Sequence, residues 1–160
     1  MLRCFRGGTV VQDLESREKY EAIRELIDKA PVFGSAPERQ LVEEAVIRRE
    51  KLLSTGLGKG VAVAHGTTEA VSDILIALGI SQEGIEFDAL DRAPVHLLFV
   101  IVNPPHRQVD YLTALSAVIR LVRDEAFRAA LRARLPAREI ERRICDAFGA
   151  CLNRLNPLPA

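Results

Sequence analysis

The chain has 160 residues, of which 48% are hydrophobic and 28% are charged, and its formal net charge is zero. This length and composition are those of one globular domain with a core of its own. The charge balance argues against a general nucleic-acid binder and against a protein held on an anionic membrane surface. The longest apolar run, residues 95–102, has the length of a strand and is too short to cross a bilayer.

The cysteines and the first residues predict a cytoplasmic protein. The opening stretch MLRCFRGGTV lacks the apolar segment of a secretion signal. Cys4, Cys145 and Cys151 form neither a CxxC motif nor a metal-ligand spacing, and an odd number of cysteines without an export signal is typical of reduced thiols. We expect Cys145 and Cys151 to be small core residues of a helix, and we expect no metal site.

Two helices are predicted in the first third of the chain. The first covers residues 16–30, where Ser16 can cap the start and a proline follows the end. The second begins after the capping-box pair Ser35 and Glu38 and runs to about Leu53. The side chains of this second helix that are expected to face the core are Leu41, Val42, Ala45, Val46 and Leu52.

The middle of the chain predicts strands joined by loops. Residues 54–60 form a glycine-rich loop, which lacks the GK[ST] ending of a phosphate-binding Walker loop. Residues 60–64 predict a short buried strand, residues 95–102 a strand covered on both faces, and residues 79–88 a short strand or hairpin. Residues 71–78 fit a helix or a strand, and periodicity alone does not decide between them.

Three helices are predicted after the double proline, over residues 108–122, 124–135 and 138–155. Eight arginines between residues 120 and 143 make this region basic, which indicates either a solvated helical face or a docking surface for an acidic partner. Without a repeat or a linker, residues 1–160 are predicted to form one α/β domain. The core side chains expected from the first and last of these helices are Leu112, Leu115, Val118, Ile119, Val122, Ile140, Ile144, Phe148, Cys151 and Leu155.

Two of the three histidines have simple structural explanations. His96 lies inside the apolar strand and is expected to be a structural histidine with a satisfied ring. His106 follows two prolines at the C-terminal end of that strand, where α/β proteins often carry binding sites. A solvated loop histidine is the simpler interpretation of His106.

His65 differs because a buried strand opens there into a Gly-Thr-Thr turn. The strand fixes the backbone of His65, the turn leaves its ring accessible, and Gly66 lets another backbone segment approach closely. The hydroxyls of Thr67 and Thr68, together with the turn amides, can bind an anion. Since imidazole titrates near neutral pH, a nucleophilic nitrogen is available, and this suits a histidine that accepts a phosphoryl group.

The segment REKLLSTGLGKGVAVAHGT, residues 49–67, resembles the signature of a known family. The family is that of the type-2, mannitol/fructose-type enzyme IIA domains of the bacterial phosphoenolpyruvate-dependent sugar phosphotransferase system. Arg49, the glycine loop and His65 agree with the family pattern in order and spacing, and the GTTEA stretch at residues 66–70 continues as in mannitol-type members. The resemblance covers most of residues 9–150.

This resemblance implies an α/β (α+β) fold in three layers, with a mixed β-sheet flanked by helices on both faces and a strand at Ile74–Ile80. It also implies that His65 receives a phosphoryl group from the phosphocarrier protein HPr and passes it to a cysteine or histidine of an enzyme IIB. The family residue matched by Arg49 lies in the active site, where a guanidinium can bind two phosphate oxygens at once. The resemblance implies no cofactor.

The sequence departs from the family pattern at two positions. Ala64 replaces the proline that precedes the family's histidine, and Tyr111 stands where many members have a second active-site histidine. A phenol can donate one hydrogen bond to a phosphate, but it carries no positive charge near neutral pH. His106, shortly upstream of Tyr111, is a candidate to compensate if the loop folds back.

Three functions are compatible with these residues. The first is a phosphoryl-carrier enzyme IIA in sugar uptake, and the second is a nitrogen-type regulatory IIA protein that controls other proteins according to its phosphorylation state. The third is a protein that keeps the fold without the chemistry, against which the presence of both His65 and Arg49 argues. Neither of the first two functions involves nucleic acid or insertion into a membrane.

Overall fold

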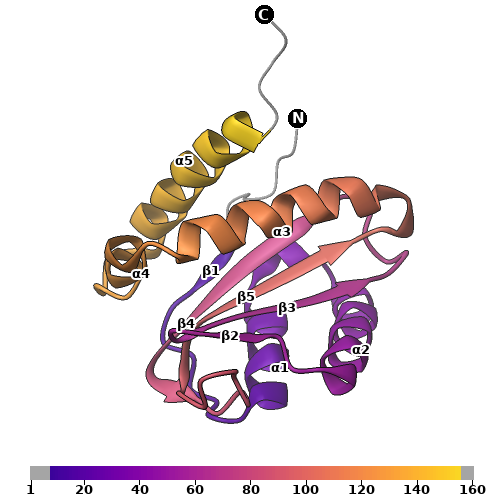
Figure 1. Cartoon of the computed structure of the whole chain (residues 1–160). Helices are drawn as coiled ribbons and strands as arrows, with labels where there is room; N and C mark the ends of the chain where they lie inside the picture. Colours follow the sequence, from indigo (N-terminus) through magenta and orange to yellow (C-terminus); the bar gives the residue numbers. More distant parts are fainter. Residues whose placement is uncertain (1–7, 156–160) are drawn as a thin grey trace, which may run out of the picture.

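A computed structural model of the chain describes residues 8–155, with the side chain of Leu155 and the whole of Cys4 outside the described part. One sheet lies between two layers of helices (Figure 1). The strands are β1 (Val10–Val11), β2 (Gly56–Gly58), β3 (Val61–Thr67), β4 (Leu75–Ile85) and β5 (Val95–Asn103). The α-helices are α1 (Lys19–Lys29), α2 (Ala36–Leu52), α3 (Gln108–Val122), α4 (Glu125–Leu131) and α5 (Ala137–Leu155), and short 3-10 turns cover Pro31–Phe33 and Pro105–Arg107.

The sheet is mixed, with the strand order β1-β4-β5-β3-β2. β3 runs parallel to β5, whereas β4 runs antiparallel to β5, and β1 is parallel to β4. In the β3–β5 pair, His65 lies opposite Ile101 and Thr67 lies opposite Asn103. The C-terminal ends of β3 and β5 therefore lie together on one side of the sheet, and the C-terminal ends of β1 and β4 lie on the opposite side. These two sides, at which strands end, are here called the two edges of the sheet.

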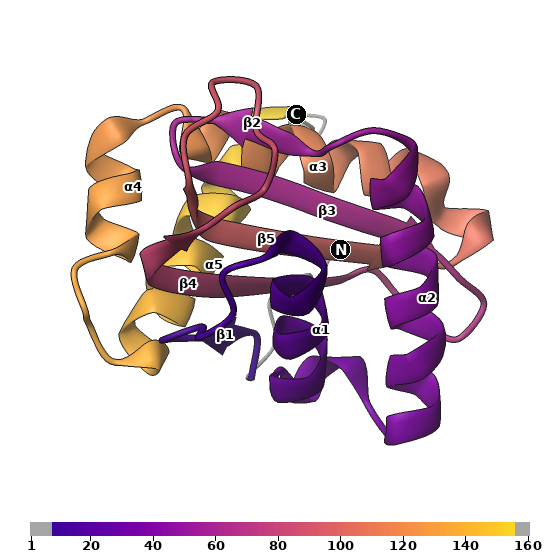
Figure 2. The same ribbon diagram turned by 90° about the horizontal axis from the view of Figure 1, so that it is seen from below.

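Apolar residues alternate between the two faces of the sheet, as the pleat requires. Val61, Val63 and Phe99 belong to one core with residues of α3 and α5. Ala62 and Val100 belong to the other core, with residues of α1 and α2. Figure 2 shows α1 and α2 from below, across the face opposite to α3. The three-layer architecture with helices on both faces is the one that the sequence predicted.

The strands are longer than the sequence indicated. The second half of the segment 71–78, which periodicity left open, and most of the segment 79–88, predicted as a short strand or hairpin, form one strand, β4, paired with β5 from Leu75 to Ile85. β3 also continues beyond Ala64, so that His65 lies within the strand rather than after it. β1 was not predicted, because two residues carry no periodicity. It is held by α5, where Glu141 Oε1 accepts hydrogen bonds from three successive backbone N–H groups, those of residues 8–10.

Several helix predictions need correction. α1 begins at Lys19, and its first turn is capped by the carboxylate of Glu18 rather than by Ser16. The capping box of α2 is confirmed, with the Ser35 N–H donating to Glu38 Oε2 over 2.8 Å. The predicted helix 124–135 ends at Leu131, because Arg134 adopts a positive φ and a proline follows.

Some residues assigned to the core are exposed. Leu41 is 51% exposed and Leu52 is 79% exposed, because α2 turns Val42 and Val46 toward the sheet instead. Leu112 is 57% exposed, since α3 buries the neighbouring Tyr111. Cys145 is exposed, whereas Cys151 is buried as predicted and lies 3.8 Å from the carbonyl oxygen of Ala117.

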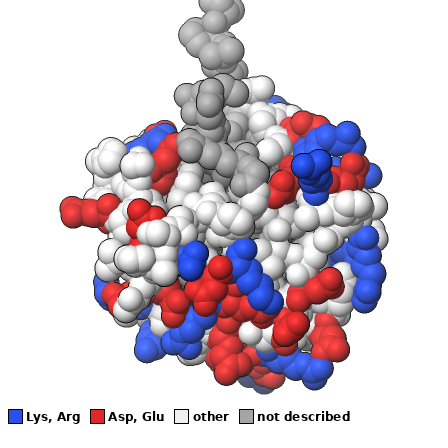
Figure 3. All heavy atoms as spheres, turned by 180° about the vertical axis from the view of Figure 1, so that it is seen from behind, with Lys and Arg blue, Asp and Glu red and all other residues white. Residues whose placement is uncertain are grey.

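His96 has the structural role that the sequence predicted. Its Nδ1 lies 2.8 Å from the carbonyl oxygen of Ser81, so the ring fastens β5 to the bulged part of β4. None of the helices within residues 8–155 combines the length and the apolar character that a membrane span requires. The rear face carries acidic and basic side chains close together rather than a field of one sign (Figure 3), in agreement with the zero net charge.

Candidate functional site

The imidazole of His65 lies near the C-terminal end of β3, at the edge of the sheet where β5 also ends. The ring is partly buried and no described side chain forms a hydrogen bond or ion pair with it. Burial, helped by the positive charge of Arg49, lowers the pKa of His65 from 6.5 to about 4. The ring is therefore neutral near pH 7, and one of its nitrogens carries a free lone pair.

Gly66 explains how α2 comes so close to this strand. A Cβ at this position would lie 2.8 Å from the backbone nitrogen of Val46 and 2.9 Å from the carbonyl carbon of Ala45. Only glycine leaves room for this contact between backbones. The close packing brings the last turns of α2, with Arg48 and Arg49, to the edge of the sheet beside His65.

Arg49 is held at the C-terminal end of α2, where its Nη1 donates to the carbonyl oxygen of Leu53 over 3.0 Å. Its charge helps to lower the pKa of His65 and opposes the rise in the pKa of Tyr111, and its side chain lines the same hollow as both rings. The next residue, Glu50, is 2% exposed and does not line the hollow. Its carboxylate accepts hydrogen bonds from the N–H and the hydroxyl of Thr55 and thereby fixes the start of the glycine-rich segment.

Tyr111 is the aromatic neighbour of His65. The two rings meet edge to face, with centroids 5.5 Å apart and an angle of 81° between their planes. Burial raises the pKa of Tyr111 to about 12, although Arg49 acts in the opposite direction. The phenol therefore keeps its proton at physiological pH and can donate a hydrogen bond beside the imidazole.

These groups surround an open hollow of about 340 Å³, here called the His65 hollow. It brings together Arg49, His65, Thr67 and Tyr111 of the predicted site. Neither Thr68 nor His106 lines it: the Thr68 hydroxyl accepts from the Ala70 N–H, and His106 is exposed in the turn before α3. The residues that line the hollow are Ala45, Arg48, Arg49, Leu52, His65, Gly66, Thr67, Asn103 and Tyr111.

The sequence interpretation missed a polar network beside this hollow. The Thr67 hydroxyl lies 3.3 Å from Asn103 Oδ1 and accepts a hydrogen bond from Gln108 Nε2, also over 3.3 Å. Asn103 is 1% exposed and anchors itself by donating to the Pro104 carbonyl. The signal for Asn103 was available, since it is the one polar residue at the end of an otherwise apolar strand. Residues 8–155 contain no cluster of metal-binding side chains.

Comparison with known proteins assigns this arrangement to a family. Residues 3–146 match the family described as "Phosphoenolpyruvate-dependent sugar phosphotransferase system, EIIA 2". The chain is 35% identical over 123 residues to the "PTS system fructose-specific EIIABC component" of Bacillus subtilis. That match covers 77% of this chain and only 19% of the relative, so the chain spans about a fifth of that protein.

A second relative is similar over nearly its whole length. The "Nitrogen regulatory protein" of Klebsiella oxytoca is 38% identical over 147 residues, which cover 90% of this chain and 86% of the relative. The crystal structure of nitrogen regulatory protein IIA-Ntr from Neisseria meningitidis superposes with a TM-score of 0.76 at 30% identity, over 91% of this chain and 93% of that one. Fold, motif and full-length similarity agree, and the chain belongs to the EIIA 2 family of the phosphoenolpyruvate-dependent sugar phosphotransferase system.

Proposed function

We propose that the chain is a phosphoryl carrier that accepts a phosphoryl group from phospho-HPr on His65 and passes it to an enzyme IIB. The observation that carries the proposal is a neutral, partly buried imidazole that has no hydrogen-bond partner within residues 8–155 and lines the same hollow as a guanidinium and a phenol. Family membership supports phosphotransferase chemistry in general. Family resemblance supplies the donor and the acceptor, and the reduced thiols predicted from the sequence favour the cytoplasm as its compartment.

The proposed transfer exchanges one nitrogen–phosphorus bond for another. The unprotonated nitrogen of His65 attacks the phosphorus as the bond to the donor histidine breaks. The donor ring, protonated on its other nitrogen, leaves as a neutral imidazole. The other nitrogen of His65 keeps its proton during the attack and can then lose it to solvent. Onward transfer reverses these roles, with a cysteine thiolate or a histidine of the enzyme IIB as the nucleophile.

Arg49 and Tyr111 are the groups that would stabilise the moving phosphoryl group. Such a transfer needs positioning and charge stabilisation more than covalent help from the protein. A guanidinium can bind two equatorial oxygens, and Arg49 needs no proton exchange to do so. The protonated phenol of Tyr111 can donate one further hydrogen bond, and the Thr67 hydroxyl is held by Asn103 and Gln108 at the same edge.

The surface around His65 suits protein partners. Large exposed apolar side chains gather on the two helices whose ends flank the hollow, namely on the C-terminal end of α2 and the N-terminal end of α3. Exposed apolar side chains beside polar groups are typical of docking surfaces. These residues are Leu52 (79% exposed), Leu53 (71%), Val109 (78%) and Leu112 (57%).

A regulatory role is the second candidate function. Two nitrogen regulatory proteins match nine-tenths of the chain, so the similarity extends well beyond the segment around the histidine. In that role the same phosphorylation of His65 would switch the surface around α2 and α3 between partners. The two functions share the first step and differ only in what receives the signal.

The first test is phosphorylation of the purified chain by phosphoenolpyruvate, enzyme I and HPr. We expect intact mass at neutral or alkaline pH to increase by one phosphoryl group, because phosphohistidine is labile to acid. His65→Ala should abolish the gain, whereas His106→Ala should leave it unchanged, since His106 does not line the hollow. A folded wild-type chain that gains no phosphoryl group would overturn the proposal. Transfer from the phosphorylated chain to enzyme IIB proteins then separates the carrier from the regulator.

A further inference from the structure

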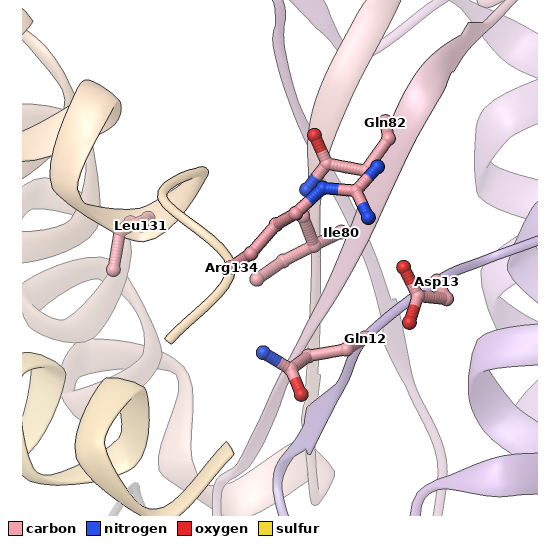
Figure 4. A pocket seen from close by; sticks show the side chains of 6 residues that line it. All are labelled: Gln12, Asp13, Ile80, Gln82, Leu131 and Arg134. Carbon is pink, nitrogen blue, oxygen red and sulfur yellow. The ribbon is translucent and has the colours of Figure 1, made fainter. Parts of the chain in front are cut away.

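A second polar hollow lies at the opposite edge of the sheet, here called the Arg134 hollow (Figure 4). Ile80 pairs with Leu97, whereas His65 pairs with Ile101, so the two sites are separated by at least four residues of β5, or about 13 Å. The residues that line the Arg134 hollow are Gln12 and Asp13 after β1, Ile80 and Gln82 of β4, and Leu131 and Arg134 at the end of α4.

The two glutamines leave oxygen acceptors for a ligand. Gln12 Nε2 donates to the carbonyl oxygen of Leu135, and Gln82 Nε2 donates to that of Arg132 over 3.3 Å. Both amide nitrogens are therefore engaged with the chain between α4 and α5. The two amide oxygens have no partner among the described residues. Together with the carboxylate of Asp13, they place three acceptor groups among the residues that line the hollow, with the amide of Gln82 beside Arg134 and that of Gln12 on the far side (Figure 4).

Asp13 and Arg134 are two opposite charges that line one hollow without pairing. Neither has an ion-pair or side-chain hydrogen-bond partner within residues 8–155. Both have left-handed backbone conformations, with φ of 56° at Asp13 and 57° at Arg134, so each side chain projects from a sharply turned backbone. Figure 4 shows the carboxylate and the guanidinium on either side of the same space.

This arrangement matches the charges of a zwitterion. An ammonium group has three N–H donors and can donate to the carboxylate of Asp13 and to a free glutamine oxygen, and a guanidinium binds a carboxylate through two parallel hydrogen bonds. Ile80 and Leu131 are 2% and 1% exposed and form an apolar wall for the carbon between the two charged groups. The space of about 90 Å³ is several times what one water needs.

A larger hollow of about 360 Å³ continues from this one and shares Asp13, Gln82 and Arg134 with it. It is lined further by Glu15, Arg17 and Glu83, so a ligand side chain that extends there meets polar groups. We propose that the Arg134 hollow binds the ammonium and carboxylate of a free α-amino acid, whose polar side chain extends into the adjoining hollow. The inference does not depend on the phosphoryl transfer proposed for His65.

The proposed amino-acid site is tested by titrating the unphosphorylated full-length chain with L-glutamine and with L-serine. The titration is monitored through the backbone amide chemical shifts in NMR spectra. We expect saturable shifts at Asp13, Gln82 and Arg134. Two blocked ligands separate the charges: N-acetyl-L-glutamine lacks the ammonium, and L-glutamine amide lacks the carboxylate. Each should bind at least about tenfold more weakly, because each loses charge-assisted hydrogen bonds. Equal binding of the blocked ligands would overturn the proposal, as would the absence of saturable shifts at tens of millimolar L-glutamine.

Charge-neutral variants then assign the two ends of the ligand. Asp13→Asn retains the left-handed backbone, which asparagine tolerates, and should weaken binding of L-glutamine about tenfold. Arg134→Gln should do the same. The matched controls are Asp28→Asn and Arg138→Gln, which remove exposed charges that line neither hollow. If Asp13→Asn and Arg134→Gln bind as the controls do, the ligand is held elsewhere and the proposal fails.

Discussion

The two edges of the central sheet carry their polar groups in different ways. At the edge where β3 and β5 end, His65 is partly buried and Tyr111 is 9% exposed, and burial lowers the pKa of His65 to about 4 and raises the pKa of Tyr111 to about 12. At the opposite edge, Asp13 and Arg134 are exposed, and neither forms an ion pair with another described residue. A group whose reactivity must differ from its behaviour in water needs neighbours on several sides. Recognition of a charged ligand needs only that opposite charges be held apart.

The largest effect on the rate of phosphorylation is expected when the guanidinium is removed from the His65 edge. Arg49→Gln should slow phosphorylation by phospho-HPr about 100-fold or more, because it removes the positive charge beside the moving phosphoryl group. The free energy of unfolding should change little, since within residues 8–155 the Arg49 side chain makes a single hydrogen bond, to the backbone carbonyl of Leu53. Rapid-quench phosphorylation kinetics measure the effect, and Arg138→Gln on α5 is the matched control. A rate within twofold of wild type would remove Arg49 from the mechanism.

The next largest effect is expected from Gly66→Ala, which tests whether the close packing of α2 on β3 creates the site around His65. In Gly66→Ala, the added Cβ meets the backbone of α2 at 2.8 Å, so the helix must move away from β3. Such overpacking should lower the free energy of unfolding by about 1–3 kcal/mol in urea denaturation and should slow phosphorylation several-fold by displacing Arg49.

Gly149→Ala is the matched control for this substitution. No atom lies within 4 Å of a Cβ placed at Gly149, and the residue lies within α5. Alanine should therefore raise the free energy of unfolding by about 0.5–1 kcal/mol and leave phosphorylation unchanged. If the two variants behaved alike, close packing of α2 would not be what builds the site.

Tyr111→Phe sharpens the comparison by removing a single hydroxyl. Burial keeps the phenol protonated, so that it can donate a hydrogen bond. Loss of the hydroxyl should therefore remove one hydrogen bond to the phosphoryl group and slow phosphorylation about fivefold to tenfold. The edge-to-face ring contact with His65 remains, so thermal stability should change by no more than about 0.5 kcal/mol. Phosphorylation kinetics at several pH values provide the measurement, and an unchanged rate would show that the phenol only packs.

The smallest effect is the pH dependence of stability. The pKa of His65 is about 4 in the folded chain and about 6.5 when unfolded, so the unfolded state binds more protons between these values. The stabilisation is fully present above pH 6.5 and decreases as the pH falls toward 4. After allowance for partial exposure, it amounts to about 1–2 kcal/mol.

Urea denaturation from pH 7 to pH 4 measures this effect, with His65→Gln as the reference without a titrating ring. As the pH falls from 7 to 4, the free energy of unfolding of the wild-type chain should decrease relative to that of His65→Gln. In Arg49→Gln, an NMR titration of His65 should give a pKa above 4 that stays below 6.5, because burial is the larger cause of the shift. A wild-type pKa near 6.5 would show that the ring is solvated.

The sequence alone determined the class of fold, the family and most of the elements. Residues 95–102 could be read as a buried strand because every position except His96 is apolar. The start of α2 could be read from its capping box, and α3 from its periodic apolar residues after a proline pair. Arg49 and His65 could be selected because they share a contiguous motif. Family membership is confirmed, while the roles of these two residues stay predictions.

Tertiary structure alone decided which surfaces meet. Periodicity placed Leu112 in the core, but the fit of α3 against the sheet buries Tyr111 instead and brings it to His65. β1 exists only because β4 and Glu141 offer hydrogen bonds to it. The lowered pKa of His65 and the unpaired charges of Asp13 and Arg134 also arise from segments far apart in the chain. Local patterns encode propensity and periodicity, whereas contacts between distant residues depend on how the layers pack.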